Sequence, residues 1–408
     1  MMPASPEQQP RRPQAMAKGA PFALTDELQT RQQQGLLRER RAMQSGQGPR
    51  VQMEGRSYLN FSSNDYLGAA ARPEIVEAWR QGLALWGAGS GASPLVTGYT
   101  RAHQALEEAL AEWLDVEAVL LFSTGFAANQ AVLKALLKPH HRQWHDRLNH
   151  ASLQEAGALL PAKMHRFRHN DLAHLASQLQ PDAGLIISEG VFSMDGDQAP
   201  CAELLALAEQ SGNWLMLDDA HGFGVHGRGG RGTLAAQGVP PARVPILVGT
   251  FGKAFGTAGA FVAGSRELVA FLTNFARDYV YSTHMPAAQA VATLAALRWV
   301  QQAEAERAHL QQLIAQFRQG ATELGLQLLP SQTAIQPLLI GGSESALKVA
   351  RQLQAQGCWV SAIRPPTVPQ GMARLRLTLT AAHAASDVEQ LLEALALCQE
   401  LRQEQCHE

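Results

Sequence analysis

One lysine in this sequence stands where an amine could react with a carbonyl compound. Lys253 lies in GTFGKAFGTAG, residues 249–259, between two apolar segments, residues 244–248 and 260–263, that predict buried strands. No carboxylate lies within four residues of it in the sequence, although burial of an unpaired ammonium is costly. Desolvation lowers the pKa of a lysine and frees a neutral amine that attacks carbonyl groups. The pattern therefore indicates a nucleophilic lysine at the end of a strand.

A carboxylate pair ends another apolar segment, in WLMLDDAHGFG, residues 214–224. Asp218 and Asp219 follow the predicted strand, and His221 comes three positions after Asp218. A carboxylate at a buried strand end needs a cation or hydrogen-bond donors. The pair could instead cap the following loop or hold a metal, but the other histidines are scattered along the chain. Three of them, in HHRQWH, are expected on the solvated end of a helix: His140, His141 and His145.

A third candidate is the turn in LLFSTGFAANQAVL, residues 120–133, where a strand ends at Phe122 and a helix begins near Phe126. A turn of Ser, Thr and Gly before a helix leaves backbone N–H groups directed at one point, which suits a phosphate. The same residues could serve only as a helix N-cap, through Ser123 or Thr124. The motif alone leaves the two interpretations equal.

One ligand would use all three features, and it is pyridoxal 5'-phosphate. Its aldehyde would form a Schiff base with Lys253, its ring nitrogen would meet Asp218, and its phosphate would lie at the turn of residues 124–126. Each signal is weak by itself. Their order along the chain, with the lysine some thirty residues after the Asp-x-x-His segment, is a strong indication of this cofactor.

The elements that must position these residues form an α/β pattern. Short apolar strands alternate with helices from Arg101 to about Thr283, with strands expected at residues 118–122, 184–188, 214–217, 246–248 and 259–263. Such alternation predicts a mostly parallel sheet with both faces covered, and ligands of such sheets bind beyond the carboxyl ends of the strands. We expect four parts: a disordered tail (1–24), an N-terminal helix and strand arm (25–60), a large α/β domain (61–285) and a smaller C-terminal α+β domain (286–408). The helix of the arm is expected from Thr25 to Arg41.

Composition narrows the class of protein. The chain of 408 residues is 46% hydrophobic and 17% charged, with a formal net charge of -2. This balance is typical of a globular protein and argues against nucleic acid or an anionic membrane as the partner. The first 19 residues lack the apolar core of a signal peptide, so we expect a cytoplasmic protein. The four cysteines form no CxxC pair, which argues against a zinc site or a disulfide framework.

Five motifs together resemble the α-oxoamine synthases, which are fold-type I pyridoxal phosphate enzymes. They are FSSNDYLG (61–68), DRLNHASL (146–153), EGVFSMDGD (189–197), DDAHGFG (218–224) and TFGKAFG (250–256). The resemblance extends from about Leu28 over nearly the whole chain. It implies a large, mostly parallel-sheet domain, a smaller C-terminal domain and a homodimer with composite active sites.

The resemblance also implies roles for individual residues. Lys253, Asp218 and His150 would be catalytic, with His150 stacked over the cofactor ring. The remaining cofactor contacts would come from Gly125, Phe126, Ser193, His221, Thr250 and, across the dimer, Thr283. The substrate side would include Arg38, Asn64, Thr367 and Arg376. Without the resemblance, His150 would be taken for an ordinary loop histidine.

The reaction that the resemblance implies is a decarboxylative condensation of L-alanine with a pimeloyl thioester, a step of biotin synthesis. The thiol carrier would be coenzyme A or an acyl carrier protein. Other members of the family condense glycine with acetyl-CoA, and an aminotransferase would share Lys253 and Asp218. Most aminotransferases, however, stack an aromatic side chain where this chain offers His150. A regulatory module that senses pyridoxal phosphate would need a DNA-binding domain, for which the first sixty residues are too short and too polar.

Overall fold

The computed structural model describes residues 22–181 and 184–398, and the chain divides into two compact units, residues 1–41 and 42–408. Most of the predicted disordered tail lies outside the described residues. In the first unit, helix α1 runs from Leu24 to Gln33, so the prediction of a helix to Arg41 is wrong. The chain leaves the helix at Gly35, whose φ of 65° is left-handed. The N–H of Leu36 then closes the end by donating to the carbonyl of Arg31 at 2.8 Å.

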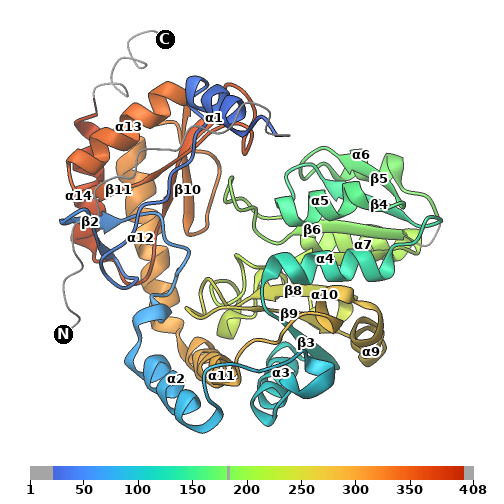
Figure 1. Cartoon of the computed structure of the whole chain (residues 1–408). Helices are drawn as coiled ribbons and strands as arrows, with labels where there is room; N and C mark the ends of the chain where they lie inside the picture. The colour runs from blue at the N-terminus through green and yellow to red at the C-terminus, as the bar shows by residue number, and fades with distance from the viewer. Residues whose placement is uncertain (1–21, 182–183, 399–408) are drawn as a thin grey trace. The chain divides into compact units, whose positions relative to one another are not determined.

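The second unit contains a seven-stranded sheet in the order β3-β9-β8-β7-β6-β4-β5 (Figure 1). Its strands are β3 (Ala118–Phe122), β4 (Arg142–Asp146), β5 (Lys163–Phe167), β6 (Gly184–Glu189), β7 (Trp214–Asp218), β8 (Ile246–Thr250) and β9 (Ala260–Gly264). Strands β5, β4, β6, β7 and β8 are parallel, whereas β9 pairs antiparallel with both β8 and β3. The predicted α/β class with a mostly parallel sheet is confirmed.

Helices cover both faces of this sheet, which explains why its strands read as apolar runs. On one face Leu120 and Ile187 pack with residues of α4 (Gly125–Leu136), α5 (Ala151–Leu159) and α9 (Arg266–Phe275). On the other face Leu121 and Ile186 pack with residues of α3 (Arg101–Leu114), α7 (Cys201–Ser211) and α11 (Ala287–Gln302). Neighbouring residues of one strand thus enter two different cores.

Two smaller sheets contain the remaining strands. Strands β10 (Ile335–Gly341), β12 (Ser361–Ile363) and β13 (Ala373–Thr378) form one, in which β13 is central. Strands β1 (Arg50–Met53), β2 (Arg56–Asn60) and β11 (Cys358–Trp359) form the other. The helices outside the large sheet include α2 (Pro73–Trp86), α12 (Glu304–Glu323), α13 (Ser343–Ala355) and α14 (Ala385–Ala396). The predicted domain boundaries at residues 60/61 and 285/286 stay predictions.

The prediction did not include strands β4 and β5, and β4 changes the expected position of one histidine. His145 lies in β4 and is fully buried, so its expected position on a solvated helix end is wrong. The polar residues of this strand do not form the apolar pattern of a buried strand. They can be buried because partners satisfy them: the Gln143 amide donates to the carbonyls of Gly157 and Ala162, each at 3.0 Å. His145 in turn bonds the Gln143 Oε1 at 2.8 Å.

The described helices include none that combines the length and the apolar character needed to cross a membrane.

Candidate active site

The carboxyl ends of three adjacent parallel strands bring the candidate residues together. Strands β6, β7 and β8 are neighbours, and Glu189 at the end of β6 pairs in register with Asp218 at the end of β7. Asp218 pairs in turn with Val248 of β8, which lies five residues before Lys253. The expected site at this edge of the sheet therefore has its main residues on adjoining strands.

Lys253 lies in a tight turn after β8. The Gly256 N–H donates to the Lys253 carbonyl at 2.9 Å, and Gly256 itself has a φ of 65°. A Cβ on Gly256 would lie 2.2 Å from the backbone nitrogen of Ala70, so the turn requires glycine there. Burial lowers the pKa of Lys253 to about 8, although Asp218 and Glu189 favour its charged form. The amine is thus more nucleophilic at neutral pH than an exposed lysine.

The two aspartates of the DDAH segment have different tasks. Asp218 Oδ2 accepts from Asn129 Nδ2 at 2.7 Å, and its Oδ1 accepts from the Ala220 N–H at 3.0 Å. Asp219 is fully buried and accepts from the hydroxyl and the N–H of Thr233, at 2.7 and 2.6 Å. Burial raises the pKa of Asp219 to about 7. The loop-capping interpretation therefore fits Asp219, whereas Asp218 faces the lysine.

His150 lies at the start of α5 and is exposed. Its backbone N–H donates to the Glu189 carboxylate, and its Nδ1 contacts the Ser152 hydroxyl at 2.8 Å. The Asn129 amide reaches the same hydroxyl at 3.0 Å, which connects His150 to Asp218. Desolvation and then Lys253 lower the pKa of His150, while Asp218 opposes them.

Glu189 is a residue of this site that the sequence did not single out. It is buried, and burial together with the nearby Asp218 raises its pKa well above the ordinary value. Its sequence signals are its place at the end of a strand and its position as the first residue of the motif EGVFSMDGD. Asn129 and Tyr66 were also not predicted, and both lie inside motifs that were recognised for other residues.

The predicted phosphate turn has an open backbone. Thr124 caps α4 by accepting from the Ala127 N–H at 3.1 Å, which leaves the N–H groups of Gly125 and Phe126 directed out of the helix end. A Cβ built on Gly125 would meet only Thr250, at 3.9 Å, and one built on Gly252 would meet nothing closer than 3.8 Å. Space bordered by Thr250 is therefore available for an anion.

The substrate-side residues Asn64 and Arg376 are in direct contact. Both terminal nitrogens of the buried Arg376 donate to Asn64 Oδ1 at 3.2 Å, and Nε donates to the Ser193 carbonyl at 2.6 Å. The Tyr66 hydroxyl contacts His221 Nδ1 at 2.7 Å and lies 3.5 Å from Arg376. Burial, then Lys253 and Arg376, lower the pKa of His221 well below its usual value, so this imidazole is neutral.

Three further predicted residues lie in segments between helices and strands. Thr283 is exposed in the segment between α10 (Arg277–Val280) and α11. Thr367 is exposed in the loop between β12 and β13. Arg38 follows α1 and belongs to the unit of residues 1–41. Their roles remain predictions.

The residues present suit pyridoxal phosphate. Lys253 offers an amine of lowered pKa, and the helix end at Gly125 offers an open anion cradle. Each oxygen of Asp218 accepts one hydrogen bond from the protein, and a carboxylate oxygen can accept a second. A protonated ring nitrogen could therefore bind there.

Comparisons with known proteins agree with this geometry. Residues 56–395 match the family model described as aminotransferase class I and II. The 8-amino-7-oxononanoate synthase of Aeromonas salmonicida is 62% identical over 383 residues, which are 94% of this chain and 96% of the relative. The enzyme of the same name from Stutzerimonas stutzeri is 51% identical and covers 94% of this chain and 99% of its own.

Solved structures give the same grouping. The serine palmitoyltransferase of Sphingomonas wittichii superposes with a TM-score of 0.87 at 30% identity, covering 94% of this chain and 98% of that one. The 8-amino-7-oxononanoate synthase of Francisella tularensis has a TM-score of 0.76 at 28% identity, covering 85% and 99%. The resemblance predicted from the five motifs is confirmed.

Proposed function

Since the chain belongs to the class I and II aminotransferase family, and within it to the 8-amino-7-oxononanoate synthases, we propose that it condenses L-alanine with a pimeloyl thioester. The products would be 8-amino-7-oxononanoate, carbon dioxide and the free thiol. The observation that carries the proposal is the meeting of Lys253, Asp218 and the open helix end at Gly125 at one sheet edge. Identities of 50–64% to synthases of this one name favour this reaction over that of serine palmitoyltransferase.

The enzyme is a pyridoxal phosphate-dependent acyltransferase, and its residues divide the binding of that cofactor. Lys253 would hold it covalently, Asp218 would pair with its ring nitrogen, and the N–H groups of Gly125 and Phe126 would hold its phosphate. Ser193 and His221 would bond its phenolic oxygen, beside Thr250 at the phosphate end. When bound, the cofactor supplies an electron sink for the carbanion that forms at the α-carbon of the amino acid.

Arg376 and Asn64 would bind the carboxylate of the amino acid. The planar fork of a guanidinium matches a carboxylate in two parallel hydrogen bonds. The carbonyl of Ser193 and the side chain of Asn64 already hold the fork in one orientation. This preorganisation supports a recognition role for Arg376. Arg374, two residues earlier on β13, donates to Asp195 at 2.7 Å, which supports a structural role for that arginine.

Proton transfer at the α-carbon would fall to Lys253 and His150. A lysine with a pKa of about 8 can accept a proton near neutral pH and return it later. Asp218 and Glu189 lie close enough to stabilise the protonated form of Lys253. His150, whose backbone is fixed by Glu189, would lie over the cofactor ring and also move a proton.

A homodimer with shared sites is part of the proposal. Thr283 is exposed and so is Tyr281, at 71%, as expected of a segment that a second subunit covers. Thr283 would reach the phosphate of the partner's site. Arg38 and Thr367 would contact the substrate. The identity of the acyl carrier, coenzyme A or an acyl carrier protein, stays a prediction, and so does the cytoplasmic location.

Product analysis tests the reaction directly. The purified holoenzyme would be incubated with each pairing of L-alanine, glycine or L-serine with acetyl-, pimeloyl- or palmitoyl-CoA, and with pimeloyl-acyl carrier protein. Mass spectrometry should find the amino-oxo acid and carbon dioxide from L-alanine and a pimeloyl thioester. Preferred turnover of glycine with acetyl-CoA, or transfer of the amino group without loss of carbon dioxide, would contradict the proposal.

A further inference from the structure

The turn that carries Ser193 is a tightly closed hairpin of residues 191–198. The Phe192 N–H donates to the Asp197 carbonyl at 3.0 Å, and the Gly196 N–H donates to the Phe192 carbonyl at 2.8 Å. Gly196 has a φ of 69°, and a Cβ there would lie 2.4 Å from a carbonyl oxygen of β10. The hairpin therefore packs directly on the C-terminal sheet.

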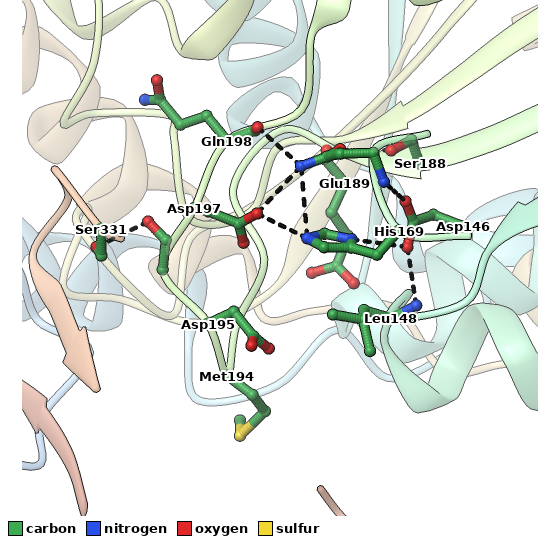
Figure 2. A network of polar contacts seen from close by, with 12 residues as sticks. Asp146, Leu148, His169, Ser188, Glu189, Met194, Asp195, Asp197, Gln198 and Ser331 are labelled. Atoms are coloured by element: carbon green, nitrogen blue, oxygen red, sulfur yellow. Dashed lines mark hydrogen bonds and ion pairs between the residues drawn. The ribbon is translucent and has the colours of Figure 1, made fainter. Parts of the chain in front are cut away.

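His169 holds the opposite side of this hairpin, as Figure 2 shows. Its Nδ1 lies 3.0 Å from Asp146 Oδ1 at the end of β4, and its Nε2 lies 2.6 Å from Asp197 Oδ2. Its ring meets that of Phe192 edge to face, with centroids 4.4 Å apart. Because each ring nitrogen faces a carboxylate, both must carry a proton, and the ring is an imidazolium.

The charge of His169 is stable at neutral pH. Burial lowers its pKa, but hydrogen bonds to Asp146 and Asp197 outweigh burial and raise the pKa to about 10. The charged neighbours on its own turn, Arg168 and Asp171, pair with each other at 2.7 Å, and the arginine is 63% exposed. The groups that face the imidazole are thus the two carboxylates and the amide of Asn170, which also donates to Asp197 at 3.0 Å.

Residues 331–376 bind the same hairpin through three of its backbone carbonyl groups. Ser331 and Thr333 donate to the Gly196 carbonyl at 2.8 and 3.0 Å. Arg374 Nη1 lies 3.3 Å from the Met194 carbonyl, and Arg376 donates to the Ser193 carbonyl. The hairpin therefore joins the large sheet to the residues that orient the Arg376 fork.

We propose that His169 is a positioning residue: as a cation between Asp146 and Asp197, it fixes the hairpin that orients Arg376, and so sets the affinity for the substrate carboxylate. The inference rests on the proposed function only through the role of Arg376. Loss of the cation leaves Asp146 and Asp197 without their shared counter-charge, so the link from the hairpin to β4 depends on the neutral Asn170, which donates to Asp146 at 2.9 Å and to Asp197 at 3.0 Å. Ser193 and the Arg376 fork would then shift together.

The first measurement concerns the charge and needs no catalysis. Holoenzyme labelled with nitrogen-15 in its histidine rings would be compared with the His169→Asn variant to assign the signals. Both ring nitrogens of His169 should be protonated from pH 6.5 to 9. A neutral ring at pH 7.5 would overturn the proposal.

The second measurement is the dissociation constant of L-alanine, from the absorbance change of the holoenzyme. His169→Asn should raise it about tenfold, the scale on which one misplaced charge-assisted hydrogen bond acts. His140→Asn, at an exposed histidine after α4, is the matched control and should leave it unchanged. Asp197→Asn removes one of the two carboxylates that keep His169 protonated, so the pKa of His169 should fall. The dissociation constant of L-alanine for this variant, divided by that for the parent, should therefore rise with pH, with a midpoint between about 6.5 and about 10.

The outcomes separate this inference from the proposed function. If Arg376→Lys weakens alanine binding but His169→Asn does not, the role of Arg376 stands and the positioning role fails. If neither change weakens binding, both fail. A loss of thermal stability with an unchanged alanine constant would make His169 merely structural and overturn the proposal. Should His169→Asn not fold, the pH-dependent ratio of Asp197→Asn decides the question alone.

Discussion

Replacing Arg376 by lysine should weaken the binding of L-alanine. The loss should be larger than for a charge-conserving substitution at another arginine that contacts the sheet of β10, β13 and β12. The guanidinium makes one bond to the Ser193 carbonyl, at 2.6 Å, and two to Asn64 Oδ1, at 3.2 Å. A lysine keeps the positive charge but has a single nitrogen, which cannot hold Ser193 and Asn64 and also present a fork to a carboxylate.

The expected magnitude follows from the lost contact to the substrate. A hydrogen bond to a charged group contributes about 1.5–3 kcal/mol, so the loss of one arm of the fork should raise the dissociation constant of L-alanine about 10- to 150-fold. Because Arg376 is 7% exposed, solvent does not replace the missing donor. The turnover number at saturating alanine should fall less than the ratio kcat/KM, since the reacting atoms keep their partners.

The assay is a titration of the holoenzyme with L-alanine, followed by absorbance, beside steady-state kinetics. Arg318→Lys is the matched control, because that arginine serves the same sheet through Gln336 Oε1, at 2.9 Å, and the Leu329 carbonyl, at 3.3 Å. It should bind alanine as the parent does. A folded Arg376→Lys protein whose constant stays within about twofold of the parent, less than the weakest expected loss, would refute the carboxylate role.

Four further outcomes follow from the site. Borohydride reduction and peptide mapping should place the cofactor on Lys253, and Lys253→Ala should abolish both the label and turnover; a label on Lys134, Lys138 or Lys163 would contradict this. The rate of cofactor loading should rise with pH up to about 8, where Lys253 becomes neutral, and then level off, whereas an ordinary lysine would give a rise that continues beyond pH 10. Asp218→Asn should retain the cofactor but lose about 10- to 1,000-fold in kcat, since an opposite charge shifts a pKa by about 1–3 units; Asp219→Asn, as control, should chiefly lower the melting temperature. Heterodimers of a Lys253→Ala chain with a Thr283→Glu chain should exceed both parents in activity, because one site carries both lesions and the other neither; folded heterodimers without recovery would refute the shared site.

The sequence by itself determined the residues whose chemistry is local. Lys253, Asp218 and the turn at Gly125 each follow an apolar segment, and the alternation of such segments with helices implied that their ends meet at one edge of a parallel sheet. The cofactor class followed from these types in this order. The strand predictions failed at β4, whose letters RQWHD hide a buried strand, because its polar groups are satisfied by partners that no periodicity reveals.

Only the tertiary structure decided which distant side chains share a hydrogen bond. Arg376 and Asn64 are 312 residues apart, Tyr66 and His221 are 155 apart, and both pairs are in contact. The same holds for the pairing of Asn129 with Asp218, of Glu189 with the backbone of His150, and of His169 with two carboxylates. A hydrophobic pattern reports the face on which a residue lies, not the partner opposite it. Burial then shifts the pKa values of Lys253 and Glu189, whereas at His169 two carboxylates outweigh burial and raise the pKa, because the free energy of a charge depends on groups that only the fold brings near.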